Sequence, residues 1–314
     1  MTVTPLSDSQ IITFYLTSGA ENIALIRGRI ASVGKPATTI LQRHAYPPAI
    51  ARMQAEALAL TACLASTLKF EGIFTLQAKG DALVRTLFAD MTSDGDLRGY
   101  AAFDADAPSP DNDDPTLPAN VPQLMGSGHI AFTVDEGATG GRYQGIVDLE
   151  GATLSDAATS WFANSEQLDT LVVAASHQQD QQWQATAMML QRIATEGGEN
   201  GSAAERDLSD DAWHTAKTLM ESVRFDEMVD PTLSPEALIF RLFNSMEPHV
   251  APVREVRDKC RCSPQRVENM LGQLDPADLT DLADEDGQIE IICEFCKTKR
   301  QIRTDEIAAS PASQ

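Results

Sequence analysis

Alternating apolar and polar residues dominate the first part of the chain and predict β-strands. Residues 11–16 and 22–33 both show this period of two, and Ser18-Gly19 forms a turn between them. From 48 to 69 the apolar residues instead recur at spacings of three and four. The proline at the start suits a first helical turn, so a helix is expected there. The strands expected after this helix are 73–78, 83–89, 97–103, 129–134, 143–149, 171–175 and 183–193.

The order of these elements repeats along the first 195 residues. Ser155 is expected to cap a second helix that ends near 164, so the order strand-strand-helix-strand-strand occurs twice. This order predicts one N-terminal α+β domain, 1–195, built from two similar halves. Residues 104–122, between the halves, are rich in Asp and Pro, and we expect a solvated loop without regular structure.

Residues 196–202 predict a linker, and the pattern beyond them is helical, so 196–250 is expected to form a helical linker region. An apolar stripe lies between 212 and 223. A further helix starts with Ser234 as its N-cap and Pro235 in its first turn. Its wide apolar face must be covered. It either packs permanently on the N-terminal domain or is a cover that can be released. The apolar residues of this helix are Leu238, Ile239, Phe240, Leu242, Phe243 and Met246.

Four of the five cysteines stand in two tight pairs near the C-terminus. Cys260 and Cys262 are separated by one residue, and Cys293 and Cys296 by two. Such thiols can converge on one tetrahedral ion, and zinc favours four thiolates. We therefore expect these four cysteines to bind Zn²⁺ in a small C-terminal zinc-binding domain, 251–314. The other elements expected there are helices starting at Ser263-Pro264 and Asp275-Pro276 and a strand at 288–292.

The cysteine pairs also suit a zinc staple with no further role, or two structural disulfides in a secreted protein. Against secretion, the chain starts without the basic and apolar regions of a signal peptide. No run approaches the ~18 apolar residues of a membrane span. We therefore expect a cytoplasmic protein with reduced thiols and no membrane partner. Cys63 lies on the apolar stripe of the first helix, and we interpret it as a small buried hydrophobic residue.

The chain is acidic, with 46 acidic against 24 basic residues and a formal net charge of -22 over 314 residues. Such a surface repels nucleic-acid phosphates and favours solubility. Basic residues nevertheless flank the cysteines. They either offset the charge of the thiolates or are ordinary surface residues, and both interpretations stay open. These residues are Lys259, Arg261, Lys297 and Lys299.

The sequence favours no enzyme class. Its five histidines are scattered and form no His-Glu-x-x-His motif, and neither a Walker loop nor a dinucleotide fingerprint occurs. The pair Cys293 and Cys296 lacks the βαβ pattern of a thioredoxin-like motif. The alternative function is a zinc-ribbon adaptor that binds protein or nucleic acid. The basic cluster that favours it is Lys297, Lys299, Arg300 and Arg303.

The cysteine-containing region is small, at about 55 residues, so its core needs a staple to be stable. Structural zinc supplies ~10–16 kcal/mol of apparent binding free energy, against a typical domain stability of ~5–15 kcal/mol. Loss of the ion is therefore expected to unfold this region. If the region covers the helices at 209–246, its unfolding would expose them.

Several motifs accompany the cysteines. Cys-x-Cys, thirty further residues and Cys-x-x-Cys end a chain of this length. The others are Leu68-Lys-Phe-Glu-Gly, Gln123-Leu-Met-Gly-Ser-Gly-His, Arg142-Tyr-Gln-Gly-Ile-Val-Asp-Leu-Glu-Gly, and Trp161-Phe162 ahead of Ser165-Glu-Gln-Leu. Together they resemble the redox-regulated heat-shock holdases of the 33-kDa chaperonin family. The resemblance extends from the first strands to Ile302, and is least in the Asp/Pro-rich loop and the final tail.

The resemblance implies an ATP-independent chaperone that is zinc-bound and inactive when reduced. By analogy, oxidants with heat would form disulfides Cys260–Cys262 and Cys293–Cys296 and release zinc. The zinc domain and the helical linker would then unfold, and the protein would capture unfolding client proteins. The family further implies hand-over of clients to an ATP-dependent refolding chaperone, and a monomer that can form a homodimer when oxidised.

Overall fold

The structure is a computed structural model that describes residues 9–18, 23–66, 71–107, 114, 116–137, 140–193 and 203–307. The chain forms two compact units, Met1–Asp258 and Lys259–Gln314. The linker expected at 196–202 lies outside the described residues. The expected division at 195 and 250 stays a prediction.

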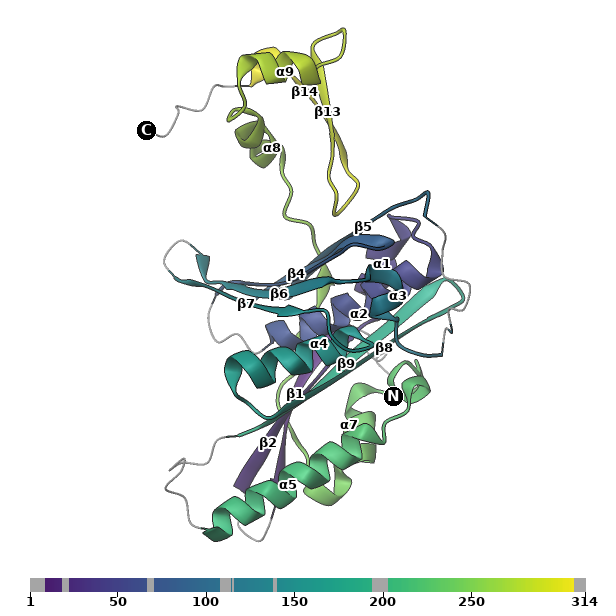
Figure 1. The fold of residues 1–314 in the computed structure, drawn as a ribbon, viewed down its shortest axis with the longest axis vertical. Coiled ribbons are helices and arrows are strands. Elements are labelled where there is room, and N and C mark those ends of the chain that lie inside the picture. Colours follow the sequence, from purple (N-terminus) through teal and green to yellow (C-terminus); the bar gives the residue numbers. More distant parts are fainter. Residues whose placement is uncertain are drawn as a thin grey trace, which may run out of the picture. The chain divides into compact units, whose positions relative to one another are not determined.

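The first unit contains two largely antiparallel sheets, which we call sheet A and sheet B (Figure 1). Strands β1 and β2 lie beside β9 and β8 in sheet A, in the order β1-β2-β9-β8. Sheet B has the order β5-β4-β3-β6-β7. The strands of sheet A are β1 (Ser9–Ser18), β2 (Ile23–Val33), β8 (Thr170–Gln179) and β9 (Gln182–Arg192). Those of sheet B are β3 (Ile73–Gly80), β4 (Val84–Thr92), β5 (Asp96–Phe103), β6 (Gly128–Asp135) and β7 (Arg142–Asp148).

The two halves expected from the sequence are confirmed, but they interleave rather than fold side by side. Strand β2 of the first half pairs with β9 of the second, and β3 of the first half pairs with β6 of the second. Each sheet therefore contains strands from both halves, and neither half has a complete sheet of its own.

Helix α2 (Pro48–Ala65) lies between the two sheets (Figure 1). Every residue from Ala49 to Ala65 is buried, although the sequence pattern indicates a helix with one apolar stripe. A helix buried on all sides needs small side chains where sheets approach it, and α2 is rich in alanine. Cys63 is fully buried on this helix, as expected for a small hydrophobic residue.

Three local features differ from the sequence-based expectations. Helix α1 (Gly34–Gln42) was not expected. Helix α4 (Leu154–Trp161) begins after Thr153 rather than Ser155, because the Thr153 hydroxyl accepts a hydrogen bond from the Asp156 amide at 3.1 Å. The third difference is helix α3 (Val121–Met125), which starts inside the loop expected at 104–122. That loop is not solvated throughout, since Ala119 and Val121 are buried.

Helices α5 (Ala203–Glu221), α6 (Phe225–Met228) and α7 (Pro235–Phe243) cover the face of sheet A opposite α2 (Figure 1). The wide apolar face of α7 packs on this sheet, and the rings of Phe14 and Phe243 stack with centroids 5.6 Å apart. Phe240 instead points away and is 46% exposed. The sheet residues buried under these helices include Ile12, Phe14, Leu16, Ile26, Ile30, Met188 and Leu190.

After α7 the chain runs along the edges of both sheets in a segment that we call the strap, His249–Asp258. Strands β10 (His249–Val250) and β11 (Arg254–Glu255) pair with β1. Strand β12 (Arg257–Asp258) pairs with β5. The strap therefore adds the outermost strand to sheet A and to sheet B, and it ends two residues before Cys260.

The second unit holds helices α8 (Pro264–Leu271) and α9 (Pro276–Leu282) and the hairpin of β13 (Gln288–Ile292) and β14 (Lys299–Arg303). Among its described residues, the buried apolar core consists of Leu271, Ile289 and Ile302. Met270 in α8 and Leu274 just after it are exposed. Among the described residues of the whole chain, no helix has the length and apolar character to cross a membrane.

Candidate metal centre

The two cysteine pairs lie on different elements of the second unit. Cys293 and Cys296 occupy the turn of the β13–β14 hairpin, where the Cys293 amide donates to the Thr298 carbonyl at 3.0 Å. Lys297 has a left-handed conformation, with φ of 56°, that closes this turn. Cys260 and Cys262 precede α8, which begins at Pro264, and the Cys262 amide donates to Cys260 Sγ at 3.4 Å.

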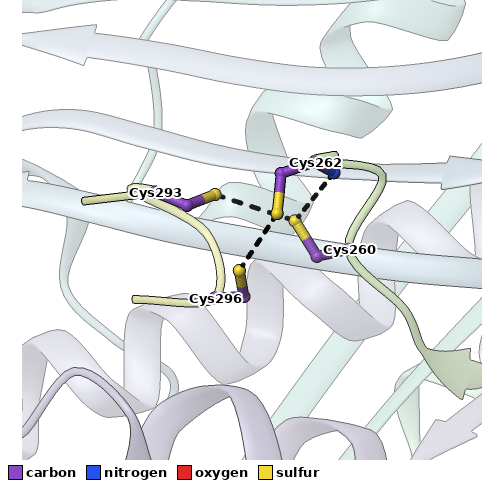
Figure 2. Close-up of side chains that lie close together, drawn as sticks. All are labelled: Cys260, Cys262, Cys293 and Cys296. Carbon is purple, nitrogen blue, oxygen red and sulfur yellow. Dashed lines mark hydrogen bonds between the residues drawn. The ribbon is translucent and has the colours of Figure 1, made fainter. Parts of the chain in front are cut away.

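All four sulfur atoms point toward one another (Figure 2). They lie within 4.8 Å of one another and form no disulfide. Cys260 Sγ lies 3.8 Å from Cys293 Sγ, and Cys262 Sγ lies 3.4 Å from Cys296 Sγ. Both of these contacts join a cysteine of the first pair to a cysteine of the second.

These separations suit a tetrahedral zinc site. Four Zn–S bonds of about 2.3 Å in tetrahedral directions separate the sulfurs by about 3.8 Å. The side chains could thus hold the ion without rearrangement of the chain. Among the described residues, the same four cysteines form the one cluster of potential metal ligands. His249, although close in sequence, is not part of it.

The surroundings shift the pKa values of Cys260, Cys293 and Cys296 in different directions. Burial raises the pKa of Cys260 to about 12, and burial also raises that of Cys293. At Cys296 burial again acts to raise the pKa, but hydrogen bonds with the Thr298 hydroxyl and amide and with the Cys262 and Cys293 sulfurs outweigh it and bring the value down to about 6. A bound cation would favour the thiolate form of all four.

The basic residues near the site have different partners in the structure. Arg300 Nη2 lies 3.6 Å from Cys262 Sγ, and this contact raises the pKa of Arg300. Lys297 and Lys299 instead form ion pairs with Glu294 and Glu290. The sequence singled out Arg300 only as part of a basic cluster. Its place beside Cys262 depends on how the hairpin packs against the segment of Cys260 and Cys262, which the sequence does not reveal.

The fold and the site thus define a two-unit protein: an interleaved α+β unit followed by a small four-cysteine unit that could hold a metal ion. Comparison with known proteins identifies the family to which this two-unit protein belongs. The family model described as Hsp33 protein matches residues 15–303, and this chain belongs to that family. The resemblance found in the sequence is therefore confirmed.

The relatives and a solved structure agree over most of the chain. The 33 kDa chaperonin of Caulobacter vibrioides is 35% identical over 280 residues, covering 88% of this chain and 90% of the relative. That of Escherichia coli is 30% identical and covers 93% and 94%. The crystal structure of the Thermotoga maritima 33 kDa chaperonin superposes with a TM-score of 0.79 at 20% identity, covering 96% of both chains. The fold is shared, and the relatives are named as chaperonins rather than enzymes.

Proposed function

We propose that this chain is a redox-regulated, ATP-independent holdase that binds Zn²⁺ through Cys260, Cys262, Cys293 and Cys296 when reduced. One observation carries the proposal: four thiols meet at zinc-ligand distances in a unit whose buried core, among the described residues, is Leu271, Ile289 and Ile302. A unit with so small a core depends on its metal for stability. Chemistry at the sulfurs therefore controls whether the unit is folded.

Oxidation would proceed at the thiolates. In each pair two thiolates lose two electrons and form one S–S bond, while one hydrogen peroxide takes up two electrons and two protons and becomes two waters. We assign the bonds Cys260–Cys262 and Cys293–Cys296, as the family resemblance implies. Sulfurs held in disulfides no longer offer four thiolate ligands, so the oxidised unit loses Zn²⁺ and unfolds.

The client surface is proposed to be the face of sheet A under α5, α6 and α7. Residues such as Phe14, Ile26 and Ile30 are fully buried there. When the second unit unfolds, the strap that connects it to α7 loosens, the helices are released, and this apolar face becomes available to unfolding proteins. Of the two interpretations of α7, we thus favour the releasable cover.

The proposal has consequences for partners and location. Clients are unfolded or aggregation-prone proteins, which are passed on to an ATP-dependent refolding chaperone. The protein acts in the cytoplasm, where thiols stay reduced until oxidants accumulate. It is a monomer when reduced and forms a homodimer when oxidised. Neither nucleic acid nor a membrane takes part, and no substrate is chemically converted.

The test of the function is aggregation of heated citrate synthase with reduced and with peroxide-treated protein. Zinc content and free thiols are counted in the same samples. We expect four of the five thiols and the zinc to be lost together with the appearance of activity. A zinc-ribbon adaptor would show no gain of activity on oxidation, and that outcome would reject the proposal.

Replacing Cys293 by Ser should weaken zinc binding and partly activate the protein without oxidant, because one ligand of four is removed. Zinc affinity is measured by chelator competition, and the protection of α5–α7 by hydrogen exchange. Cys63→Ala is the matched control, since Cys63 is a cysteine buried in α2 of the first unit and is not one of the four clustered thiols. Unchanged zinc affinity and unchanged helix protection in Cys293→Ser would contradict the proposed coupling.

A further inference from the structure

The strap occupies the outer edge of β1 with backbone hydrogen bonds. The Ala251 amide donates to the Thr13 carbonyl at 2.8 Å, and the Val256 amide donates to the Ser9 carbonyl at 3.0 Å. Without the strap, β1 would be an edge strand of sheet A, because its other side pairs with β2. An uncovered edge presents unpaired N–H and C=O groups, which is a ready template for another extended chain.

The strap is held less firmly than a regular strand. It pairs with β1 over two residues at a time, and Pro252, which has no N–H to donate, lies between the two paired segments. The strap buries little apolar surface against the sheets, since Val250 and Val253 are 43% and 48% exposed. Of its residues only Val256 is buried.

Polar contacts at the C-terminal end of the strap complete its attachment. Arg257 Nε donates to the Asp96 carboxylate at 2.5 Å, and Asp258 forms an ion pair with Arg43. Both contacts lie within two or three residues of Cys260. Unfolding of the cysteine unit would therefore act first on the end of the strap that these ion pairs hold.

We propose that the β1 edge is a docking site for an extended backbone segment of a client, and that the strap is its occupant at rest. The inference rests on the proposed holdase function and adds a second mode of binding to the apolar face of sheet A. A client segment would add a strand antiparallel to β1, as the strap does. It would place an apolar side chain in the buried position of Val256. Its backbone amides would donate hydrogen bonds to the carbonyls of Ser9 and Thr13. Unfolding proteins offer such extended, apolar segments.

The first test locks the strap to β1. Tyr15 and His249 are directly opposite, so Tyr15→Cys with His249→Cys allows a disulfide across the edge. Oxidised glutathione forms this bond while zinc is bound, mass spectrometry locates it, and peroxide is added afterwards. The matched control is His177→Cys with Gln184→Cys, a bond between β8 and β9 that leaves the β1 edge untouched.

We expect the strap lock to lower client binding at least fivefold after peroxide, with zinc release unchanged, and the β8–β9 bond to have no such effect. Equal activity of the locked protein and the control overturns the inference, as does an equal loss in both. If the unaltered protein is inactive after peroxide, the holdase function itself is wrong. The two failures are thus distinguishable.

The second test needs no folded variant. A synthetic peptide with the strap sequence 249–258 is added to peroxide-activated protein, and suppression of client binding is measured. The same peptide N-methylated at the residues that correspond to Ala251 and Val256 lacks the two amides that donate to β1. We expect the methylated peptide to inhibit at least tenfold more weakly. Equal inhibition by both peptides would mean that backbone pairing does not hold clients, and would overturn the inference.

Discussion

Single residues decide how closely the strap can lie on sheet B. Gly95 has φ of +88°, and a Cβ at this position would stand 2.3 Å from the Glu255 carbonyl oxygen. A side chain there would collide with the strap backbone, which the Arg257 amide holds close by donating to the Gly95 carbonyl at 2.9 Å. Glycine is therefore required at this position for the strap to dock.

Gly95→Ala should loosen the strap while the cysteine unit keeps its zinc. We expect exchange of the Val256 and Arg257 amides to rise at least tenfold, measured by hydrogen exchange with mass spectrometry. Gly137→Ala is the control, because Gly137 has a similar φ of +76° but nothing within 4 Å of the added carbon. Equal strap exchange in the two variants would show that the close approach to Glu255 does not limit docking.

Glu56 is a buried carboxyl in the middle of α2, and it anchors the end of the Asp/Pro-rich segment. Its two oxygens accept from the Ala119 amide at 3.0 and 3.3 Å, and Ser176 Oγ lies 3.5 Å away. Burial raises the pKa of Glu56 to about 8, although the Ala119 amide and the charge of Arg52 act to lower it. The folded protein therefore favours the protonated form of this residue.

This shift makes stability depend on pH. The native state holds a proton on Glu56 that the unfolded state loses near its ordinary pKa of 4.5. The stabilisation is complete below that value and is lost as pH rises toward about 8, at about 1.4 kcal/mol per pH unit. Glu56→Gln should flatten the fall in unfolding free energy between pH 5 and 8, measured by urea denaturation. Glu71→Gln, at an exposed position, should leave the slope unchanged; equal slopes in all three proteins would contradict the assignment.

At the scale of elements, α7 shows how one helix combines a local start signal with long-range burial. Ser234 caps it as the sequence predicts, accepting from the Ala237 amide at 3.1 Å, and Pro235 occupies the first turn. Its residues Leu238, Ile239, Leu242 and Phe243 are buried against sheet A. The helix is thus attached to the sheet by apolar packing, and weaker packing should favour its release.

Ile239→Ala removes a fully buried side chain and should destabilise the docked helix by about 2–5 kcal/mol, because a cavity replaces apolar contacts. Phe240→Ala, on the exposed side of the same helix, should cost far less. Both are measured by urea denaturation, and by the peroxide concentration needed for half-maximal activity, which Ile239→Ala should lower. Equal destabilisation by the two substitutions would mean that the apolar contacts with sheet A do not hold α7.

At the scale of the whole molecule, the two units differ in what keeps them folded. The first unit has a large core between its sheets and a second one under α5–α7. The second unit, over the residues described up to 307, has three buried apolar residues and four converging thiols. Removing a metal from these thiols should unfold the second unit alone.

A zinc chelator added to the reduced protein should abolish amide protection in 264–303 and leave β3, β4 and β6 protected. The reason is that structural zinc supplies ~10–16 kcal/mol, more than so small a core can replace. Hydrogen exchange reports both regions in one experiment, and added zinc should restore the protection. A second unit that stays protected after the metal is removed would refute the view that the metal stabilises it.

Local sequence patterns predicted most of what depends on neighbours along the chain. The residue pattern predicted strands β1 to β9 but not the short strands β10, β11 and β12, and Ser234 and Ser263 marked the starts of α7 and α8. The spacing of the four cysteines was enough to predict a metal site, because the two cysteines of each pair are close in space whatever fold the rest of the chain adopts. The family resemblance depends on the same local motifs.

Contacts between distant segments could not be predicted in this way. Alternation indicates that one side of a strand is buried but not which strand lies beside it, so the pairing of β2 with β9 and of β3 with β6 came from the tertiary structure. The same holds for the complete burial of α2, for Arg300 beside Cys262, and for the strap along β1. The physical reason is that periodicity and capping act over a few residues, whereas these contacts join segments tens to hundreds of residues apart, and only packing of the whole chain selects them.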